Sequence, residues 1–374
     1  MKLLVQPDHG IKPIIQALNS AKKSIRILIF RFDRVEIEKA LVQAVGRGVS
    51  VQALIAYTNQ GEEKSLRRLE MRLLAEGITV TRTAEDLVRY HGKMIIVDDK
   101  IAYVLGYNFT HMDIDLSRSF GVAITNPGLV KEAVRLFECD SRRRPYTKAK
   151  DDLIVSPVNA RQRLTEFIAG TKKQLLMYEM KISDRDFLKL LNHKISQGVE
   201  VRILSRASAK SGSIPVRRLP VRMHLRAMLR DGNAAFIGSQ SLRKLELEAR
   251  REVGVIFRKK TIVKQMKEIF ENDWKRSEPA VEDSKLASAL VVPAKKVAKE
   301  VAKQLAIKPI VEQALEKVID TTDSKPFEPD EVTETVCEAF HDEVQEAVKE
   351  ALKEVVVAAA EKSPAKSQGK ARQD

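Results

Sequence analysis

The chain contains one internal duplication, and this feature constrains its fold more than any other. Residues 21–25 (AKKSI) correspond to residues 171–175 (TKKQL), 150 positions later, and this offset persists through the first part of each half. Further along, His91 corresponds to His224 with an offset of 133 that again stays constant. A deletion of 17 residues in the second half, at a point corresponding to residues 56–90, accounts for the change. The sequence therefore predicts two related structural units.

Apolar strands alternate with amphipathic helices within each half. In the first half, a strand at residues 25–30 is followed by a helical pattern at 37–45, a strand at 49–56 and a charged helix at about 62–76. This order is typical of an α/β sheet with helices on its faces. The fold class we predict is therefore α/β.

The sequence predicts a two-lobed body followed by a tail. We place the first lobe at residues 1–145 and the second at 146–277, with a shared site at their interface. Residues 278–374 are rich in Ala, Lys, Glu and Val, and apolar residues recur every four positions from Val332 to Val356. This pattern indicates a partly disordered tail with helical segments. The alternative interpretation, which the pattern favours less, is a helix that docks a protein partner, a membrane or the basic body.

Charge is divided unevenly along the chain. Residues 278–374 hold 14 Lys and Arg against 20 Asp and Glu, so the total of +15 leaves +21 on residues 1–277. A body this basic favours a polyanionic partner, which is either an anionic phospholipid or membrane surface or a nucleic acid. Aromatic residues make up 5% of the chain and do not alternate with the basic ones, which argues against a stacking platform for single strands.

Neither a membrane span nor a disulfide framework is predicted. No apolar run approaches the roughly 18 residues that a spanning helix needs. Cys139 and Cys337 lie far apart and belong to no Cys/His cluster of metal-ligand spacing. We expect a cytoplasmic protein, peripheral to the membrane at most, without a metal or another cofactor.

Two polar motifs interrupt strand-like stretches at equivalent positions of the repeat. In the first, His91 and Lys93 lie on the same face of an extended chain. In the second, His224 is followed by Arg226 at the same spacing. A single histidine is most often structural, and this reading applies to the other four, which are His9, His111, His193 and His341. The recurrence of a histidine with a cation two residues later instead indicates a paired site.

These motifs resemble those of the phospholipase D superfamily. The first copy of its HxKxxxxD…GxxN-type signature is matched by His91, Lys93, Asp98, Gly106 and Asn108. The second copy is matched by His224, Arg226, Asp231, Gly238 and Ser239. The resemblance covers nearly all of residues 1–277, and it implies two α/β lobes with mixed sheets flanked by helices that bring both histidines to one cleft.

The resemblance also implies a role for each motif residue. His91 would attack the phosphorus of a phosphodiester and form a phosphohistidine, while His224 would act as general acid and then general base. Lys93 and Arg226 would bind the phosphate and neutralise its oxygens. This chemistry needs no metal.

The sequence departs from the family pattern at the acid that orients each histidine. In the family this acid follows its histidine by 28 residues, where the chain has Glu252 after His224 but Ser119 after His91. We therefore assign Glu252 to the catalytic set and expect His91 to lack its usual partner. Asp113 and Asp115 are nearby candidates to replace it.

Other motif residues are expected to support the site. Asp98 and Asp231 are assigned structural hydrogen bonds rather than proton transfer. Asn108, Ser239 and Ser241 are assigned the same supporting role, with Ser241 in the place of Asn108. Strand alternation puts Arg222 on the face of His224, which makes it our preferred additional phosphate contact.

Three functions follow from these observations. The first is a phosphodiesterase of the phospholipase D type that hydrolyses a phospholipid or transfers its phosphatidyl group. The second uses the same chemistry on DNA or RNA. The third is a non-catalytic phosphate-binding scaffold, suggested by Ser119, Arg226 and Ser241.

Overall fold

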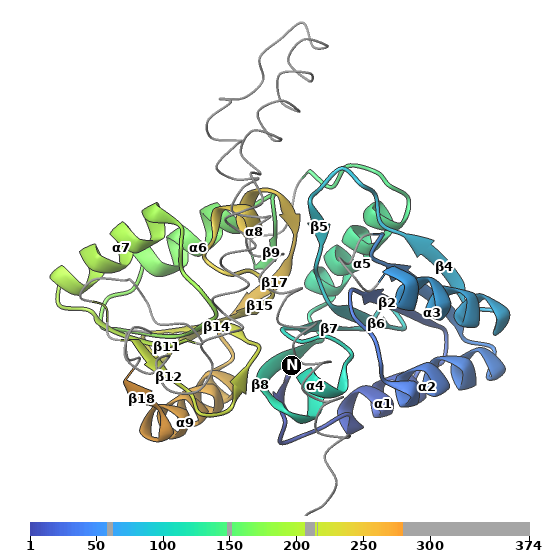
Figure 1. The fold of residues 1–374 in the computed structure, drawn as a ribbon, viewed down its shortest axis with the longest axis horizontal. Helices are drawn as coiled ribbons and strands as arrows, with labels where there is room; N and C mark the ends of the chain where they lie inside the picture. Colours follow the sequence, from blue (N-terminus) through green and yellow to red (C-terminus); the bar gives the residue numbers. More distant parts are fainter. Residues whose placement is uncertain (58–62, 148–151, 206–213, 215, 280–374) are drawn as a thin grey trace, which may run out of the picture. The chain divides into compact units, whose positions relative to one another are not determined.

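The computed structural model describes residues 1–57, 63–147, 152–205, 214 and 216–279 (Figure 1). The chain divides into two units, Met1–Glu282 and Asp283–Asp374. The second unit lies outside the described residues, and so does the predicted docking role of the tail.

The first half forms a mixed sheet with the strand order β1-β8-β7-β6-β2-β3-β4. Its strands are β1 (Lys2–Gln6), β2 (Ser24–Ile29), β3 (Ser50–Ile55), β4 (Thr79–Arg82), β6 (Met94–Val97), β7 (Ile101–Leu105) and β8 (Ser117–Ile124). The pairs β2–β3 and β3–β4 are parallel, whereas the pairs from β1 through to β2 are antiparallel. The alternating βα segments of the sequence form the parallel part, as their crossover helices require.

The second half repeats this arrangement in the order β9-β17-β15-β14-β10-β11-β12-β18. Its strands are β9 (Leu153–Val155), β10 (Gln174–Glu179), β11 (Glu200–Ser205), β12 (Val216–Arg218), β14 (Arg226–Arg230), β15 (Ala234–Gly238), β17 (Val253–Phe257) and β18 (Glu278–Pro279). Strands from β9 to β12 correspond one by one to those from β1 to β4. The duplication read in the sequence is therefore a duplication of topology.

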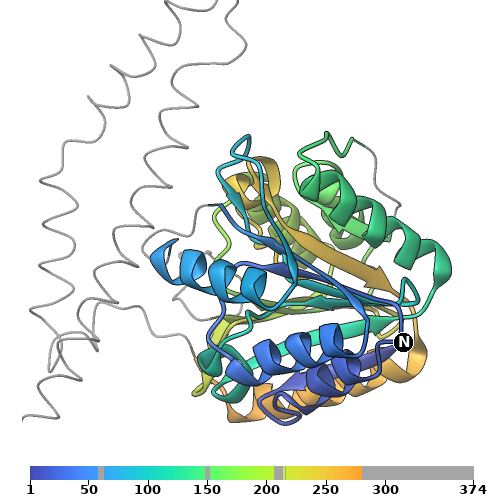
Figure 2. The same cartoon turned by 90° about the vertical axis from the view of Figure 1, so that its right-hand side faces the viewer.

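Helices flank both sheets. The first half contributes α1 (Lys12–Asn19), α2 (Val35–Gly46), α3 (Glu63–Ala75), α4 (His111–Asp115) and α5 (Pro127–Ser141). The second contributes α6 (Ala160–Ala169), α7 (Arg185–Ser196), α8 (Lys244–Glu248) and α9 (Lys260–Arg276). The helices α1 and α2 lie side by side on the outside of the first lobe (Figure 2). Within the described part of the second half, α3 has no counterpart, and the strand registers place most of the deletion between β11 and β12.

The two lobes share a hydrophobic core. Strands β7 and β8 contact β15, and β7 also contacts β17. One cluster of buried side chains accordingly includes Val104 and Phe120 of the first lobe together with Leu176, Val255 and Phe270 of the second. Because apolar burial stabilises by about 25 cal/mol per Å², this continuous core fixes the lobes against each other. Functional groups from both lobes therefore belong to one compact unit.

Each half also places a short strand against the other half, immediately before its histidine. Strand β5 (Arg89–Tyr90) pairs in parallel with β16 (Arg250–Arg251), and β13 (Arg222–Met223) pairs in parallel with β8. The backbone N–H of His91 then donates to the Arg251 carbonyl over 2.8 Å. That of His224 donates to the carbonyl of Arg118 over 3.1 Å. Each motif histidine is thus attached to the opposite lobe.

Candidate active site

His91 is held between a carboxylate and an ammonium group. Its Nδ1 lies 2.9 and 3.1 Å from the two carboxylate oxygens of Glu252, and its Nε2 lies 2.8 Å from the Nζ of Lys93. The ring of Phe30 contacts the imidazole edge to face, with 4.5 Å between centroids. Because the carboxylate accepts from Nδ1 and the ammonium donates to Nε2, the neutral ring carries its proton on Nδ1. The lone pair on Nε2 is then the nucleophilic one.

Electrostatics keep this imidazole neutral. Burial and the neighbouring charges of Lys93 and Arg226 lower the pKa of His91 well below its ordinary value. Burial likewise lowers the pKa of Lys93, a fully buried side chain, although the Glu252 carboxylate opposes this shift. A neutral histidine beside a buried cation is what attack on a phosphodiester requires.

His224 lies at ion-pair distance from Asp113, with 3.2 Å between its Nδ1 and the Asp113 Oδ2, although within the described residues this Nδ1 makes no hydrogen bond. The same carboxylate accepts from the backbone and side-chain amides of Asn108 over 2.9 and 2.8 Å, and from Nη1 of Arg222 over 2.6 Å. Burial alone would raise the pKa of Asp113, but His224 and Arg222 hold it well below its ordinary value. Asp113 therefore provides a permanent carboxylate beside the second imidazole.

The structure corrects the assignment of the orienting acids. Glu252 contacts His91 rather than His224, so the expectation that His91 lacks a carboxylate partner was wrong. Asp113 contacts His224, whereas Ser119 donates its hydroxyl to the His224 carbonyl over 2.6 Å. The reason is the exchange of short strands, because each histidine follows a strand paired with the other lobe and therefore faces that lobe's acid.

Asp115, the other candidate acid, contacts neither motif histidine in any hydrogen bond or ion pair of the described residues. Its carboxylate pairs with Arg34 and with His111, whose Nδ1 lies 2.6 Å away. The side chain of His111 is 63% exposed. Asp115 thus belongs to a peripheral ion-pair network, and sequence proximity to Asp113 was misleading.

Arg226 occupies the position equivalent to Lys93 but has different partners. Its Nε donates to the Ser241 hydroxyl over 3.0 Å, and within the described residues its buried Nη1 has no hydrogen-bond partner. The backbone N–H of Ser241 donates to Glu246 over 2.8 Å. Burial raises the pKa of the nearby Glu179 carboxyl to about 7, opposed by the charge of Arg226. A guanidinium with an unused N–H, held by the Ser241 hydroxyl in the neighbourhood of buried carboxylates, suits a phosphate oxygen.

Glu179 and Glu246 are site residues that sequence reasoning missed. The sequence contains a feature that could have identified each of them. Glu246 follows Asp113 at the repeat offset of 133, and Glu179 is a carboxylate at the end of an otherwise apolar strand. Both side chains are almost fully buried, with 3% exposure for Glu179 and 2% for Glu246.

Arg222 lies on the face of His224 but is already engaged. Its Nη1 contacts both Asp113 and the hydroxyl of Ser117. The geometry gives Arg222 a role in fixing the Asp113 carboxylate, and phosphate binding by this residue stays a prediction.

Asp98 and Asp231 lie at the opposite end of their strands and bind backbone. Asp98 accepts from three consecutive N–H groups at residues 22–24, and Asp231 accepts from the equivalent groups at residues 172–174. Both aspartates adopt a positive φ, 54° and 51°. Ser239 similarly exchanges hydrogen bonds with the backbone of Val253. These three residues support the scaffold of the motifs.

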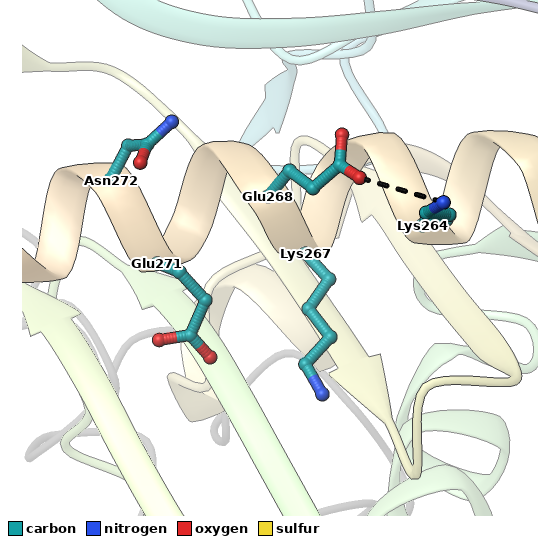
Figure 3. A pocket seen from close by; sticks show the side chains of 5 residues that line it. All are labelled: Lys264, Lys267, Glu268, Glu271 and Asn272. Atoms are coloured by element: carbon teal, nitrogen blue, oxygen red, sulfur yellow. Dashed lines mark ion pairs between the residues drawn. The ribbon is translucent and has the colours of Figure 1, made fainter.

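A hollow outside the motifs lies along α9 (Figure 3). It measures about 500 Å³ and is lined by Lys264, Lys267, Glu268, Glu271 and Asn272. Lys264 and Glu268 form an ion pair of 4.0 Å across one turn of the helix, and their side chains are 81% and 63% exposed. These are features of a solvated helix face, and none of the motif residues lines this hollow.

Comparison with known families agrees with this geometry. The model of the family described as "Cardiolipin synthase, PLD-like domain" matches residues 14–141 and 164–274, which include both motifs. The chain belongs to this family of the phospholipase D superfamily. A search of curated protein sequences gives no significant match.

Solved structures of this superfamily have the same two-lobed fold. Phosphatidylserine synthase from Haemophilus influenzae aligns with a TM-score of 0.62 at 12% identity, over 83% of this chain and 94% of that one. Polyphosphate kinase from Porphyromonas gingivalis aligns with a TM-score of 0.62 at 20% identity, over 73% of this chain. This chain spans about half the length of the kinase, 47%. At these identities the likeness establishes the fold alone, and the reaction is a separate question.

Within the described residues, no helix is both long and apolar enough to cross a bilayer.

Proposed function

We propose that this protein is a phosphodiesterase of the phospholipase D type that acts on phospholipid, by hydrolysis or by phosphatidyl transfer, through a phosphohistidine on His91. The observation that carries the proposal is the arrangement around this ring, in which Glu252 accepts from Nδ1 and Lys93 lies 2.8 Å from Nε2. A second histidine with its own carboxylate, His224 with Asp113, completes the set.

In the first step the Nε2 lone pair of His91 attacks phosphorus. A P–N bond forms, and the P–O bond to the leaving alcohol breaks with its electron pair on oxygen. The imidazolium of His224 donates its proton to that oxygen. Lys93 and Arg226 balance the charge on the remaining phosphate oxygens, and Glu252 stabilises the positive charge that develops on His91.

In the second step a water molecule or an acceptor alcohol attacks the phosphohistidine. His224, now neutral, accepts the proton of the attacking hydroxyl. The P–N bond breaks, its electron pair returns to His91, and the product phosphate leaves. Water gives hydrolysis and an alcohol gives phosphatidyl transfer, so the same residues serve both reactions.

The preference for phospholipid is supported by the family to which the chain belongs and by the positive charge of its body. The charge of +21 on residues 1–277 would hold the protein at an anionic membrane surface. A nucleic-acid substrate would use the same charge and the same chemistry, and it is the second candidate.

The chemistry is tested first with bis(p-nitrophenyl) phosphate in excess chelator, which silences contaminating metal-dependent nucleases. We expect wild type to release nitrophenol and His91→Ala to lose at least about 1,000-fold in kcat/KM. His193→Ala, an exposed histidine on α7, is the matched control and should retain full activity. Equal turnover by His91→Ala and wild type would overturn the proposal. Wild type without turnover would favour the phosphate-binding scaffold.

The substrate is tested next with phosphatidylglycerol vesicles and with single- and double-stranded DNA. We expect release or exchange of the lipid head group, abolished by His91→Ala. Cleavage of DNA without any lipid reaction would transfer the proposal to the nuclease.

A further inference from the structure

The two short interlobe ladders place different side chains before the two histidines. In the ladder of the second motif, Arg222 is in register with Ser117, and its Nη1 donates to the serine hydroxyl. In the ladder of the first motif, the equivalent positions are both arginines, because Arg89 is in register with Arg250. The site is therefore symmetric in backbone and asymmetric in charge.

The arginine pair shares a face with the nucleophile. Arg89 and His91 are two residues apart on extended chain, as are Arg250 and Glu252, so these four side chains project to one side. The contact between His91 and Glu252 and the ring of Phe30 agree with this placement. The Cζ of Arg89 lies 5.4 Å from the centroid of Phe30, whose ring also contacts His91.

Positive charge exceeds negative charge on this side. Three guanidinium groups, those of Arg89, Arg243 and Arg250, accompany the carboxylates of Glu246 and Glu252. At the equivalent positions around His224 there is one guanidinium and one carboxylate, since Thr110 and Ser117 replace two of the arginines and Ser119 replaces the glutamate. Burial and the charge of Arg250 lower the pKa of Arg89 to about 9.

Arg250 is connected to the phosphate-binding arginine through one carboxylate. Its Nη1 lies 3.5 Å from Oε1 of Glu246, whose Oε2 accepts from the Ser241 backbone, and the Ser241 hydroxyl accepts from Arg226. Arg250 is 6% exposed and Arg226 is 7% exposed. Within the described residues, neither Nε of Arg250 nor Nη1 of Arg226 has a hydrogen-bond partner. Two buried donors thus remain unused on either side of Glu246.

We propose that Arg250, together with Arg89, forms a second phosphate subsite contiguous with that of Lys93 and Arg226. The substrate class that fits carries two phosphoryl groups close together, one at His91 and one at the arginine pair. A planar guanidinium binds two phosphate oxygens at once, which suits Arg250 to this role. The inference rests on the proposed function for the identity of the first subsite.

Direct binding tests this subsite without turnover. Calorimetric titration at constant ionic strength compares inorganic pyrophosphate, which reaches both subsites, with inorganic phosphate, which fills one. We expect wild type to bind pyrophosphate about tenfold more tightly than phosphate. In Arg250→Ser, which copies the residue of the other ladder, this preference should fall below about threefold while phosphate affinity changes little. Lys264→Ser, on the exposed face of α9, should keep the full preference.

Each outcome decides the question. Equal affinity of wild type for the two anions overturns the subsite, as does an undiminished preference in Arg250→Ser. Arg250→Lys, which keeps the charge and removes the fork, replaces the serine variant if thermal melting shows that the latter does not fold, and it should lose part of the preference. Turnover of bis(p-nitrophenyl) phosphate without a pyrophosphate preference retains the proposed function and rejects the subsite. A pyrophosphate preference in a wild type without turnover supports the subsite and contradicts the proposed function.

Discussion

The histidines of the two lobes have the same backbone surroundings but take their carboxylates from different places. His91 is oriented by Glu252, whereas the equivalent position beside His224 holds Ser119 and the carboxylate comes from Asp113, six residues earlier. Each acid faces the histidine of the opposite lobe because the short strands β5 and β13 are exchanged between the lobes. A duplicated scaffold thus offers two places from which an acid reaches the same imidazole, so a lost acid need not mean a lost function.

The motif cations of the two lobes, Lys93 and Arg226, also have different surroundings. Lys93 lies against His91 and 5.3 Å from the Phe30 centroid, while Arg226 is held by Ser241 and lies near Glu179. The repeat equivalent of Glu179 in the first lobe is an isoleucine. A longer, forked cation in the second lobe is thus accompanied by an additional buried carboxyl group, and the charge of Arg226 opposes the rise of its pKa.

The largest expected effect separates the two histidines by their chemical roles. Nitrophenol leaves readily without a proton donor, so His224→Ala should still form the phosphohistidine from bis(p-nitrophenyl) phosphate but should hydrolyse it slowly. We expect a burst of about one nitrophenol per active site, followed by a steady rate reduced by at least about 1,000-fold. Stopped-flow absorbance measures both phases.

His91→Ala is the matched control, and it should show neither a burst nor turnover. A burst in His91→Ala and none in His224→Ala would exchange the roles of the two residues.

The next effect tests whether the relocated acid serves the same purpose as the original one. Glu252→Gln and Asp113→Asn should each lower kcat by about 100- to 1,000-fold, because the amide no longer stabilises the charged, correctly oriented imidazole. Steady-state kinetics with chromogenic phosphodiester measure the loss.

Adding Ser119→Glu to the Asp113→Asn variant should restore kcat by at least about tenfold, since Ser119 is equivalent to Glu252 in the repeat. Asp115→Asn should have almost no effect. A larger loss from Asp115→Asn than from Asp113→Asn would contradict the placement of the orienting acid.

Much of this arrangement was predictable from the sequence. The partners of the two histidines were not predictable, and the reason is physical. The duplication and its offsets predicted two α/β lobes, and the motif spacing selected His91 and His224. The partners of these histidines depend on which strands exchange between lobes. Two-residue strands such as β5 and β13 leave no periodic pattern in the sequence, so the crossed contacts of Glu252 and Asp113 became visible only in three dimensions.

A third effect concerns stability and the buried carboxyl of Glu179. Burial raises its pKa from 4.5 to about 7, so the folded state binds this proton more tightly than the unfolded state does. The resulting stabilisation is fully present below pH 4.5 and is lost as pH rises through about 7, a change of about 3 kcal/mol in the free energy of unfolding.

Glu179→Gln lacks this dependence, so the difference between its free energy of unfolding and that of wild type should change with pH. Urea unfolding between pH 5 and 8 measures the difference, and Glu268→Gln on the exposed face of α9 should run parallel to wild type.

The smallest effect concerns the proton that His224 must carry. In the free site burial and the charges of Arg226 and Lys93 lower the pKa of His224, and Asp113 opposes them only in part. An anion bound between Lys93 and Arg226 adds a negative charge near the ring, which at about 5 Å and an effective dielectric of about 20 is worth roughly two pKa units. Inorganic tungstate should therefore raise the pKa of His224 in a proton NMR titration. The same shift increases the fraction of His224 that carries a proton in the enzyme–substrate complex, and the coupled pair of histidines predicts a bell-shaped pH profile of kcat. A profile that is flat between about pH 5 and 9, with an unshifted His224 resonance, would remove this residue from proton transfer.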